Sequence, residues 1–173
     1  MKLQIVDHAA KVLIEGGLAD WTLDRVAARA RCAKGLIVYH HRSRAALLGQ
    51  VAGQLRRQRL ERRVTALASS GSDAVDNLWR VIEKETASGE AAAWLSLLTL
   101  KDPEVLAATR QSPAEDMALS APLARALALD PDAEALGATS LAALDGFAVA
   151  LLCHSPASQV REAYHRFWLG LLG

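Results

Sequence analysis

Residues 21–48 read WTLDRVAARARCAKGLIVYHHRSRAALL, and this stretch decides the fold that the sequence predicts. Thr22 is a suitable N-cap for a short helix. The apolar residues that follow share one helical face: Leu23, Val26, Ala27 and Ala30. A tight connection then leads to a second short helix over residues 34–40, and Ser43 can cap a third helix. Two short helices joined in this way form a helix-turn-helix, whose second helix typically enters the major groove of DNA.

The composition favours helices throughout the chain. Of the 173 residues, 51% are hydrophobic but only 5% aromatic, and the good helix formers Ala, Leu, Arg and Glu dominate. We expect an all-α protein of about nine helices. A three-helix helix-turn-helix domain over residues 1–46 would be joined by one long helix, beginning at Ser43, to a C-terminal helical bundle over residues 47–173. Pro113 and Pro122 should divide residues 104–129 into two or three helical pieces.

The net charge of +1 hides a sharp asymmetry along the chain. Residues 1–66 contain 13 Lys or Arg and 5 Asp or Glu, whereas residues 67–173 contain 7 and 14. A basic segment followed by an acidic one indicates a polyanionic partner, such as DNA, for the first part only. The arginines between positions 56 and 63 leave three interpretations open: attraction for DNA, a solvated face, or pairing with the acidic part of the chain.

Other classes of protein are disfavoured. The longest apolar run, residues 147–153, is far shorter than the roughly 20 residues of a membrane-spanning helix, and no secretion signal is recognisable. Cys32 and Cys153 have no ligand or redox spacing, so we expect reduced thiols and a cytoplasmic location. The five histidines show no ligand spacing with carboxylates, and no catalytic triad or glycine-rich phosphate loop is found. We therefore expect no enzyme, no cofactor and no metal site.

The last two predicted helices carry stripes that favour pairing with a second copy of the chain. Small residues recur at every fourth position between Pro131 and Leu152, and large apolar residues line a helix that follows Pro156. Two such helices form half of a four-helix bundle, which a homodimer would complete. Burial of both stripes within one subunit is the alternative. The predicted interface residues are Ala138, Ala142, Gly146, Ala150, Tyr164, Phe167, Trp168 and Leu171.

The segment from Ile5 to Leu48 resembles the N-terminal DNA-binding domain of the TetR family of transcriptional regulators. This resemblance implies a homodimer that binds a palindromic operator in double-stranded DNA, usually as a repressor, and that a small-molecule effector releases. Segments Ala93–Leu97 and Leu144–Phe147 also look like parts of the family's ligand-binding and dimerisation domain. The N-terminal resemblance rests on Glu15-Gly16-Gly17, Thr22–Ala27, Ala33–Ile37, Tyr39-His40, Ser43-Arg44 and Leu47-Leu48.

The resemblance also implies which residues contact DNA. The residues expected to face the bases or the DNA backbone are Lys34, Gly35, Leu36 and Val38. The residues expected to bind phosphates are Thr22, Tyr39, His40 and Arg44. Arg31 stands where the family usually has Gly and would add a positive charge to this surface, and Ala33 stands where a capping Ser or Thr is usual. Val38 and His41 replace a usual Tyr and Phe, and His41 should point toward the core.

Ligand release would require a pocket in the C-terminal domain. We expect an apolar effector pocket with Trp79, Trp94, Leu98 and Phe147 near its wall, although the same residues also suit a plain core. The departures at Ala33, Val38 and His41 keep a rival function open, in which a helical dimer binds a ligand or protein but has lost DNA binding. Specific DNA binding should weaken steeply as salt rises, and this separates the two.

Overall fold

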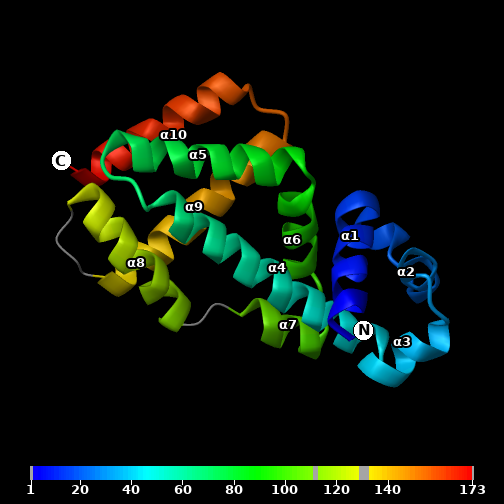
Figure 1. Cartoon of the computed structure of the whole chain (residues 1–173). Helices are drawn as coiled ribbons and strands as arrows, with labels where there is room; N and C mark the ends of the chain where they lie inside the picture. Colours follow the sequence, from blue (N-terminus) through cyan, green and yellow to red (C-terminus); the bar gives the residue numbers. More distant parts are fainter. Residues whose placement is uncertain (1, 111–112, 129–132, 173) are drawn as a thin grey trace. The chain divides into compact units, whose positions relative to one another are not determined.

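The structure is a computed structural model that describes residues 2–110, 113–128 and 133–172. These residues form ten helices and no strand, which confirms the all-α class with one helix more than expected. Residues 103–127 form two helices, in agreement with the two or three helical pieces expected there (Figure 1). The helices are α1 (Lys2–Asp20), α2 (Leu23–Ala30), α3 (Lys34–His41), α4 (Arg44–Ala66), α5 (Ser72–Ala87), α6 (Glu90–Leu98), α7 (Pro103–Thr109), α8 (Pro113–Leu127), α9 (Ala133–Leu152) and α10 (Ala157–Leu172).

Packing divides the chain into two compact units. The first unit consists of residues 1–58 and 92–110, and the second of residues 59–91 and 111–173. The helix α4 therefore contributes to both units, as does α6. Packing groups residues 47–58 with the N-terminal helices. The predicted boundary after residue 46, which separates a DNA-binding domain from a ligand-binding domain, stays a prediction.

The first unit is built around a core to which α1, α2, α3, α4, α6 and α7 contribute. The indole Nε1 of Trp21 donates a hydrogen bond of 2.8 Å to the carbonyl of Ala9, which ties the connection after α1 back onto that helix. Regular helical geometry in α1 is interrupted at Gly17, whose φ of 66° favours glycine. The core includes Ile5, Leu13, Trp21, Val26, Ile37, Leu47, Val51, Leu55, Trp94, Leu97 and Val105.

The side-chain caps follow the sequence closely. Thr22 Oγ1 accepts from the amide of Arg25 at 3.2 Å, and Ser43 Oγ accepts from the amide of Ala46 at 3.0 Å. Asp102 caps α7 by accepting from the amide of Glu104 at 2.9 Å. These bonds satisfy backbone N–H groups that have no partner inside the helix. Gly71 stands at the N-cap position of α5, which has no side-chain cap, and Ser72 is the first helical residue.

The second unit packs α5, α8, α9 and α10 against one another (Figure 1). Tyr164 lies at the centre of this core: its hydroxyl donates to the carbonyl of Val75 at 2.6 Å, and burial raises the pKa of the phenol. The expected helix break at Pro122 is wrong, because α8 continues through it. Leu119 and Leu123 beside this proline are almost fully buried, and their burial offsets the backbone hydrogen bond that proline cannot donate.

A buried cluster of charges ties the last turns of α4 into the second unit. Arg59 Nε lies 3.0 Å from Glu85 Oε2, and Arg63 Nη2 lies 2.6 Å from Asp145 Oδ1. Of the three interpretations of the arginines between positions 56 and 63, pairing with the acidic part of the chain is confirmed for Arg59, Arg62 and Arg63. We call this set the arginine–carboxylate cluster; its members are Arg59, Arg62, Arg63, Glu85, Glu90 and Asp145.

Asp145 and Arg63 show how the cluster balances burial against charge. Burial alone would raise the pKa of Asp145, but the charges of Arg63 and Arg59 outweigh it, so the pKa of this carboxyl lies below its ordinary value. Burial and the nearby Arg59 lower the pKa of the Arg63 guanidinium, which Asp145 opposes. Charges removed from water in this way are tolerated only when each has a close partner.

Candidate nucleic-acid interface

The helix α3 separates a buried face from an exposed one. Ile37 and His41 are buried, with exposed fractions of 1% and 2%. Val38 and Tyr39 are 44% and 81% exposed, which is unusual for large side chains that could have joined the core beside them. Lys34 and Gly35 are exposed at the beginning of the same helix, while Leu36 and His40 are partly buried. The buried face of α3 thus packs in the first unit, and its opposite face is open to solvent.

The turn between α2 and α3 is closed by Arg31. Its φ of 51° and ψ of 46° lie in the left-handed region, where glycine is usual, and its amide donates to the carbonyls of Ala27 and Ala28. An L-residue adopts this conformation at a cost of about 1–2 kcal/mol. The exposed guanidinium stands at the turn, in the place where the sequence predicts an added positive charge.

Ala33 begins α3 in the extended conformation of an N-cap, and no side chain caps the helix. Replacing Ala33 with serine should raise the free energy of unfolding of the first unit by about 1 kcal/mol, because the hydroxyl would accept a hydrogen bond from the first turn. Urea denaturation measures the change. The control is Ala33→Val, which adds bulk without an acceptor, and equal stabilisation by both variants would contradict the capping explanation.

Acidic neighbours hold several basic side chains near this surface. Lys34 Nζ lies 2.8 Å from Asp24 Oδ2, and both side chains are exposed. Arg25 pairs in the same way with Asp20 at 2.7 Å. The positive charge counted from the sequence is thus partly neutralised locally, and Lys34 must exchange Asp24 for any other partner. The sequence did not single out Asp24, although it lies ten residues before Lys34 in the preceding helix.

Two further contacts fix the ends of the motif. The Arg44 guanidinium lies 5.3 Å from the centre of the Trp21 ring, so this predicted phosphate ligand is held by a buried aromatic side chain. His41 Nδ1 lies 3.0 Å from Gln50 Oε1, which links the end of α3 to α4. The predicted inward orientation of His41 is confirmed. Gln50 is a residue that sequence patterns did not reveal, since a partly buried glutamine on a long helix gives no distinctive signal.

The four predicted effector residues belong to different cores. Trp79 and Phe147 both flank Tyr164 in the second unit, with ring centres 5.1 and 5.3 Å from its ring. Trp94 is buried in the first unit, and Leu98 is exposed on it. Cavities of about 470, 300 and 190 Å³ are bounded by described residues, and none of the four lines them. A pocket near these residues stays a prediction.

The predicted dimer residues also differ in their surroundings. Tyr164 and Trp168 are almost fully buried within the second unit and are therefore occupied by its own core. Ala142 and Gly146 are exposed on α9. Partly buried are Ala138, Ala150, Phe167 and Leu171. The surface that remains for a second copy consists of the outer faces of α9 and α10, where Val149 and Leu169 are also exposed.

Two further features concern membrane helices and metal sites. Among the helices that the structure describes, none is long and apolar enough to cross a membrane. Within residues 2–110, 113–128 and 133–172, no group of three or more His, Cys, Asp or Glu side chains is arranged to hold a metal ion.

Comparisons with known proteins first concern the helix-turn-helix segment. Residues 5–51 match the family of bacterial regulatory proteins described as the tetR family. This range contains α2, α3 and every residue predicted to contact DNA. No curated protein matches the chain.

Solved structures share the fold over nearly the whole chain. The multidrug binding protein EbrR complexed with ethidium is 23% identical, with a TM-score of 0.69, and the likeness covers 95% of this chain and 96% of that one. EbrR complexed with imidazole is 24% identical, with a TM-score of 0.68 and coverage of 95% and 87%. A putative transcriptional regulator from Pseudomonas aeruginosa PAO1 is 18% identical, with a TM-score of 0.67 and coverage of 98% and 88%. Residues 5–51 are thus similar to the tetR family of bacterial regulatory proteins, and the described chain shares its fold with these solved structures.

Proposed function

We propose that this chain is a ligand-responsive repressor of transcription that acts in the cytoplasm and binds a palindromic operator as a homodimer. The observation that carries the proposal is the exposed face of α3, on which Val38 and Tyr39 are 44% and 81% exposed. Lys34, Gly35, Leu36 and Val38 would face the bases or the DNA backbone, and Val38 suits a thymine methyl group. Thr22, Tyr39, His40 and Arg44 would hold phosphates and so fix the position of α3 in the groove.

The environment of Gly35 supports a close approach to DNA. A Cβ atom added at this residue would meet nothing within 4 Å, so packing within the chain does not require glycine here. Glycine inside a helix costs about 0.5–1 kcal/mol relative to alanine. Glycine at position 35 would be explained if the backbone of α3 must approach a phosphate or a base edge so closely that a side chain would not fit.

A homodimer would present two such helices to the two halves of a palindrome. The outer faces of α9 and α10 would form its interface, with Ala142 and Gly146 allowing close helix approach. An effector bound in the second unit needs only to prefer the form that does not bind DNA, and a preference of about 100-fold shifts the balance by about 2.7 kcal/mol. Since EbrR has been captured with ethidium, proflavin and imidazole, small aromatic compounds are the first effectors to test.

Selection of bound sequences from random double-stranded DNA tests the proposal. We expect a palindromic consensus, bound with an affinity that falls steeply as salt rises, because each phosphate contact releases counterions. Replacement of Tyr39 by alanine should weaken binding at least about tenfold without unfolding the protein. No binding at low salt would overturn the proposal. It would favour a helical dimer that binds a ligand or protein and has lost DNA binding, which the engagement of Lys34 by Asp24 would then explain.

Replacing Asp24 with asparagine should strengthen binding to DNA of arbitrary sequence by about 5–10-fold at low salt. The substitution frees Lys34 for a phosphate, so the slope of log affinity against log salt should steepen by about 0.9. Fluorescence anisotropy with a labelled duplex measures both quantities. Asp20→Asn is the matched control, since it removes the same charge from an exposed pair with Arg25. Equal effects of the two variants would assign the change to net charge alone.

A further inference from the structure

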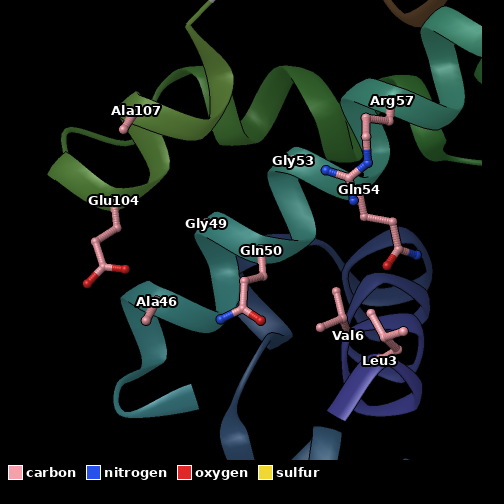
Figure 2. A pocket seen from close by; sticks show the side chains of 10 residues that line it. All are labelled: Leu3, Val6, Ala46, Gly49, Gln50, Gly53, Gln54, Arg57, Glu104 and Ala107. Atoms are coloured by element: carbon pink, nitrogen blue, oxygen red, sulfur yellow. The ribbon is translucent and has the colours of Figure 1, made fainter. Parts of the chain in front are cut away.

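A groove of about 470 Å³ lies in the first unit and is lined by residues of α1, α4 and α7 (Figure 2). Small residues of α4 form its floor: Ala46, Gly49 and Gly53. Val6 of α1 and Ala107 of α7 line its two sides. Its volume falls within the range of about 300–1,000 Å³ that is usual for small-molecule sites. We call this space the α4 groove.

The two glycines of the floor have different roles. A Cβ atom at Gly49 would lie 3.0 Å from the carbonyl oxygen of Glu104, so glycine here allows the backbone of α7 to approach α4. A Cβ atom at Gly53 would meet only the end of the Arg57 side chain, at 3.5 Å. Packing therefore explains Gly49 but does not require Gly53, and the space above Gly53 is open to a ligand.

The charge in the α4 groove comes chiefly from Arg57. Its guanidinium lies beside Gly53, and it has no ion pair or hydrogen bond within the part of the chain that the structure describes. The only carboxylate that lines the groove, Glu104, is on α7, and in Figure 2 it points away from Arg57. An unpartnered guanidinium beside an apolar floor is complementary to a carboxylate attached to an apolar body.

Two side chains of the groove also hold the neighbouring helices on α4. Gln50 Oε1 lies 3.0 Å from His41 Nδ1, at the end of α3. Gln54 Nε2 donates to Asp7 Oδ1 of α1 at 2.8 Å. A ligand that lies against Gln50 therefore touches a residue that positions the end of α3. The contacts between the ligand, Gln50 and the end of α3 all lie within the first unit.

We propose that the α4 groove binds a small apolar carboxylate, with Arg57 as the partner of the carboxylate and Gly53 beneath the apolar body. Occupation of the groove changes the surroundings of His41 through Gln50. This site is separate from the effector pocket of the proposed function. The proposal makes no use of DNA binding, so it can fail while the proposed function stands.

The test uses the full chain and three aromatic carboxylates: benzoate, salicylate and indole-3-acetate. Each is compared with its uncharged amide by isothermal titration calorimetry and by the NMR signals of the histidine rings. We expect at least one acid to bind, its amide to bind at least about tenfold more weakly, and the His41 signal to shift on binding. Arg57→Gln should lower the affinity for the acid by a similar factor, and Gly53→Leu should abolish binding by filling the groove.

The matched control is Arg110→Gln, which removes an exposed positive charge from the same unit without lining the groove. Its affinity for the acid should equal that of the original chain. If Gly53→Leu does not fold, the comparison of Arg57→Gln with Arg110→Gln decides the matter. The proposal is overturned if none of the acids binds, if binding survives Gly53→Leu, or if both arginine variants weaken it equally. The proposal would also be overturned if the chain bound proflavin and none of the acids, and if Glu104→Gln abolished the binding of proflavin, because the groove would then prefer a cation.

Discussion

Replacing Glu85 with alanine is expected to lower the free energy of unfolding of the second unit by about 3–5 kcal/mol. Glu85 is 1% exposed, and its carboxylate accepts hydrogen bonds from Arg59 and Arg62, each at 3.0 Å. Without it the buried Arg59 guanidinium keeps Asp145 but loses the other of its two carboxylate partners, and it cannot recover hydration. Urea denaturation measures the loss, with the fluorescence of Trp79 and Trp168 reporting this unit.

The control for this prediction lies two residues earlier on the same helix. Glu83 is exposed, so Glu83→Ala should change the free energy of unfolding by less than about 0.5 kcal/mol. A second variant separates charge from packing: Glu85→Leu combined with Arg59→Met removes both charges and keeps most of the volume. This double variant should be more stable than Glu85→Ala, because an apolar pair leaves no buried charge unpartnered. If Glu85→Ala and Glu83→Ala behave alike, the cluster does not hold α4 in the second unit.

Replacing Trp21 with alanine should destabilise the first unit by about 3–5 kcal/mol. The side chain is 1% exposed, its indole donates a hydrogen bond to the Ala9 carbonyl, and its ring makes a cation–π contact with the Arg44 guanidinium. The substitution therefore removes apolar burial and a buried hydrogen bond together, and it frees a predicted phosphate ligand. Hydrogen exchange of the α1–α3 amides measures the loss, since it reports this unit separately.

Tyr39 provides the matching control, as an aromatic residue of the same unit that is 81% exposed. Tyr39→Ala should leave hydrogen exchange unchanged while weakening DNA binding, whereas Trp21→Ala should affect both. Trp21→Phe isolates the hydrogen bond and should cost about 1–3 kcal/mol, because the Ala9 carbonyl would be left buried without its donor. Loss of protection in Tyr39→Ala comparable with that in Trp21→Ala would show that α3 depends on its outer face for stability.

Local patterns were sufficient to predict the helix-turn-helix. Helical spacing identified the buried face of α2, and Thr22, Ser43 and Asp102 cap helices as their chemistry predicts. The inward orientation of His41 followed from its position four residues after Ile37. Each of these inferences depends on residues within about one or two helical turns of one another, where spacing alone determines which side chains share a face.

The same local patterns could not predict which side chains far apart in the sequence contact one another. Arg59 meets Asp145, 86 residues later in the chain, and no local spacing indicates that partner. Trp79 and Trp94 look alike as apolar positions on successive helices, yet they belong to different cores because residues 92–110 pack with the first unit. Tyr164 and Trp168 form a large apolar stripe that suits a dimer interface, but the core of the second unit already buries them. Amphipathic spacing reveals that a face is buried and does not reveal by which partner.

The continuity of α4 limits how such a chain can be recombined with a relative. Residues 44–58 of this helix complete the core of the first unit, while Arg59, Arg62 and Arg63 supply the positive charges that the carboxylates of the second unit require. A hybrid gene joined within the last turns of α4 would pair one parent's carboxylates with the other parent's side chains. Because residues 92–110 also belong to the first unit, a single crossover cannot transfer that whole unit without also transferring residues 59–91 of the second unit. A hybrid that keeps both cores intact must take both segments of the first unit from the same parent.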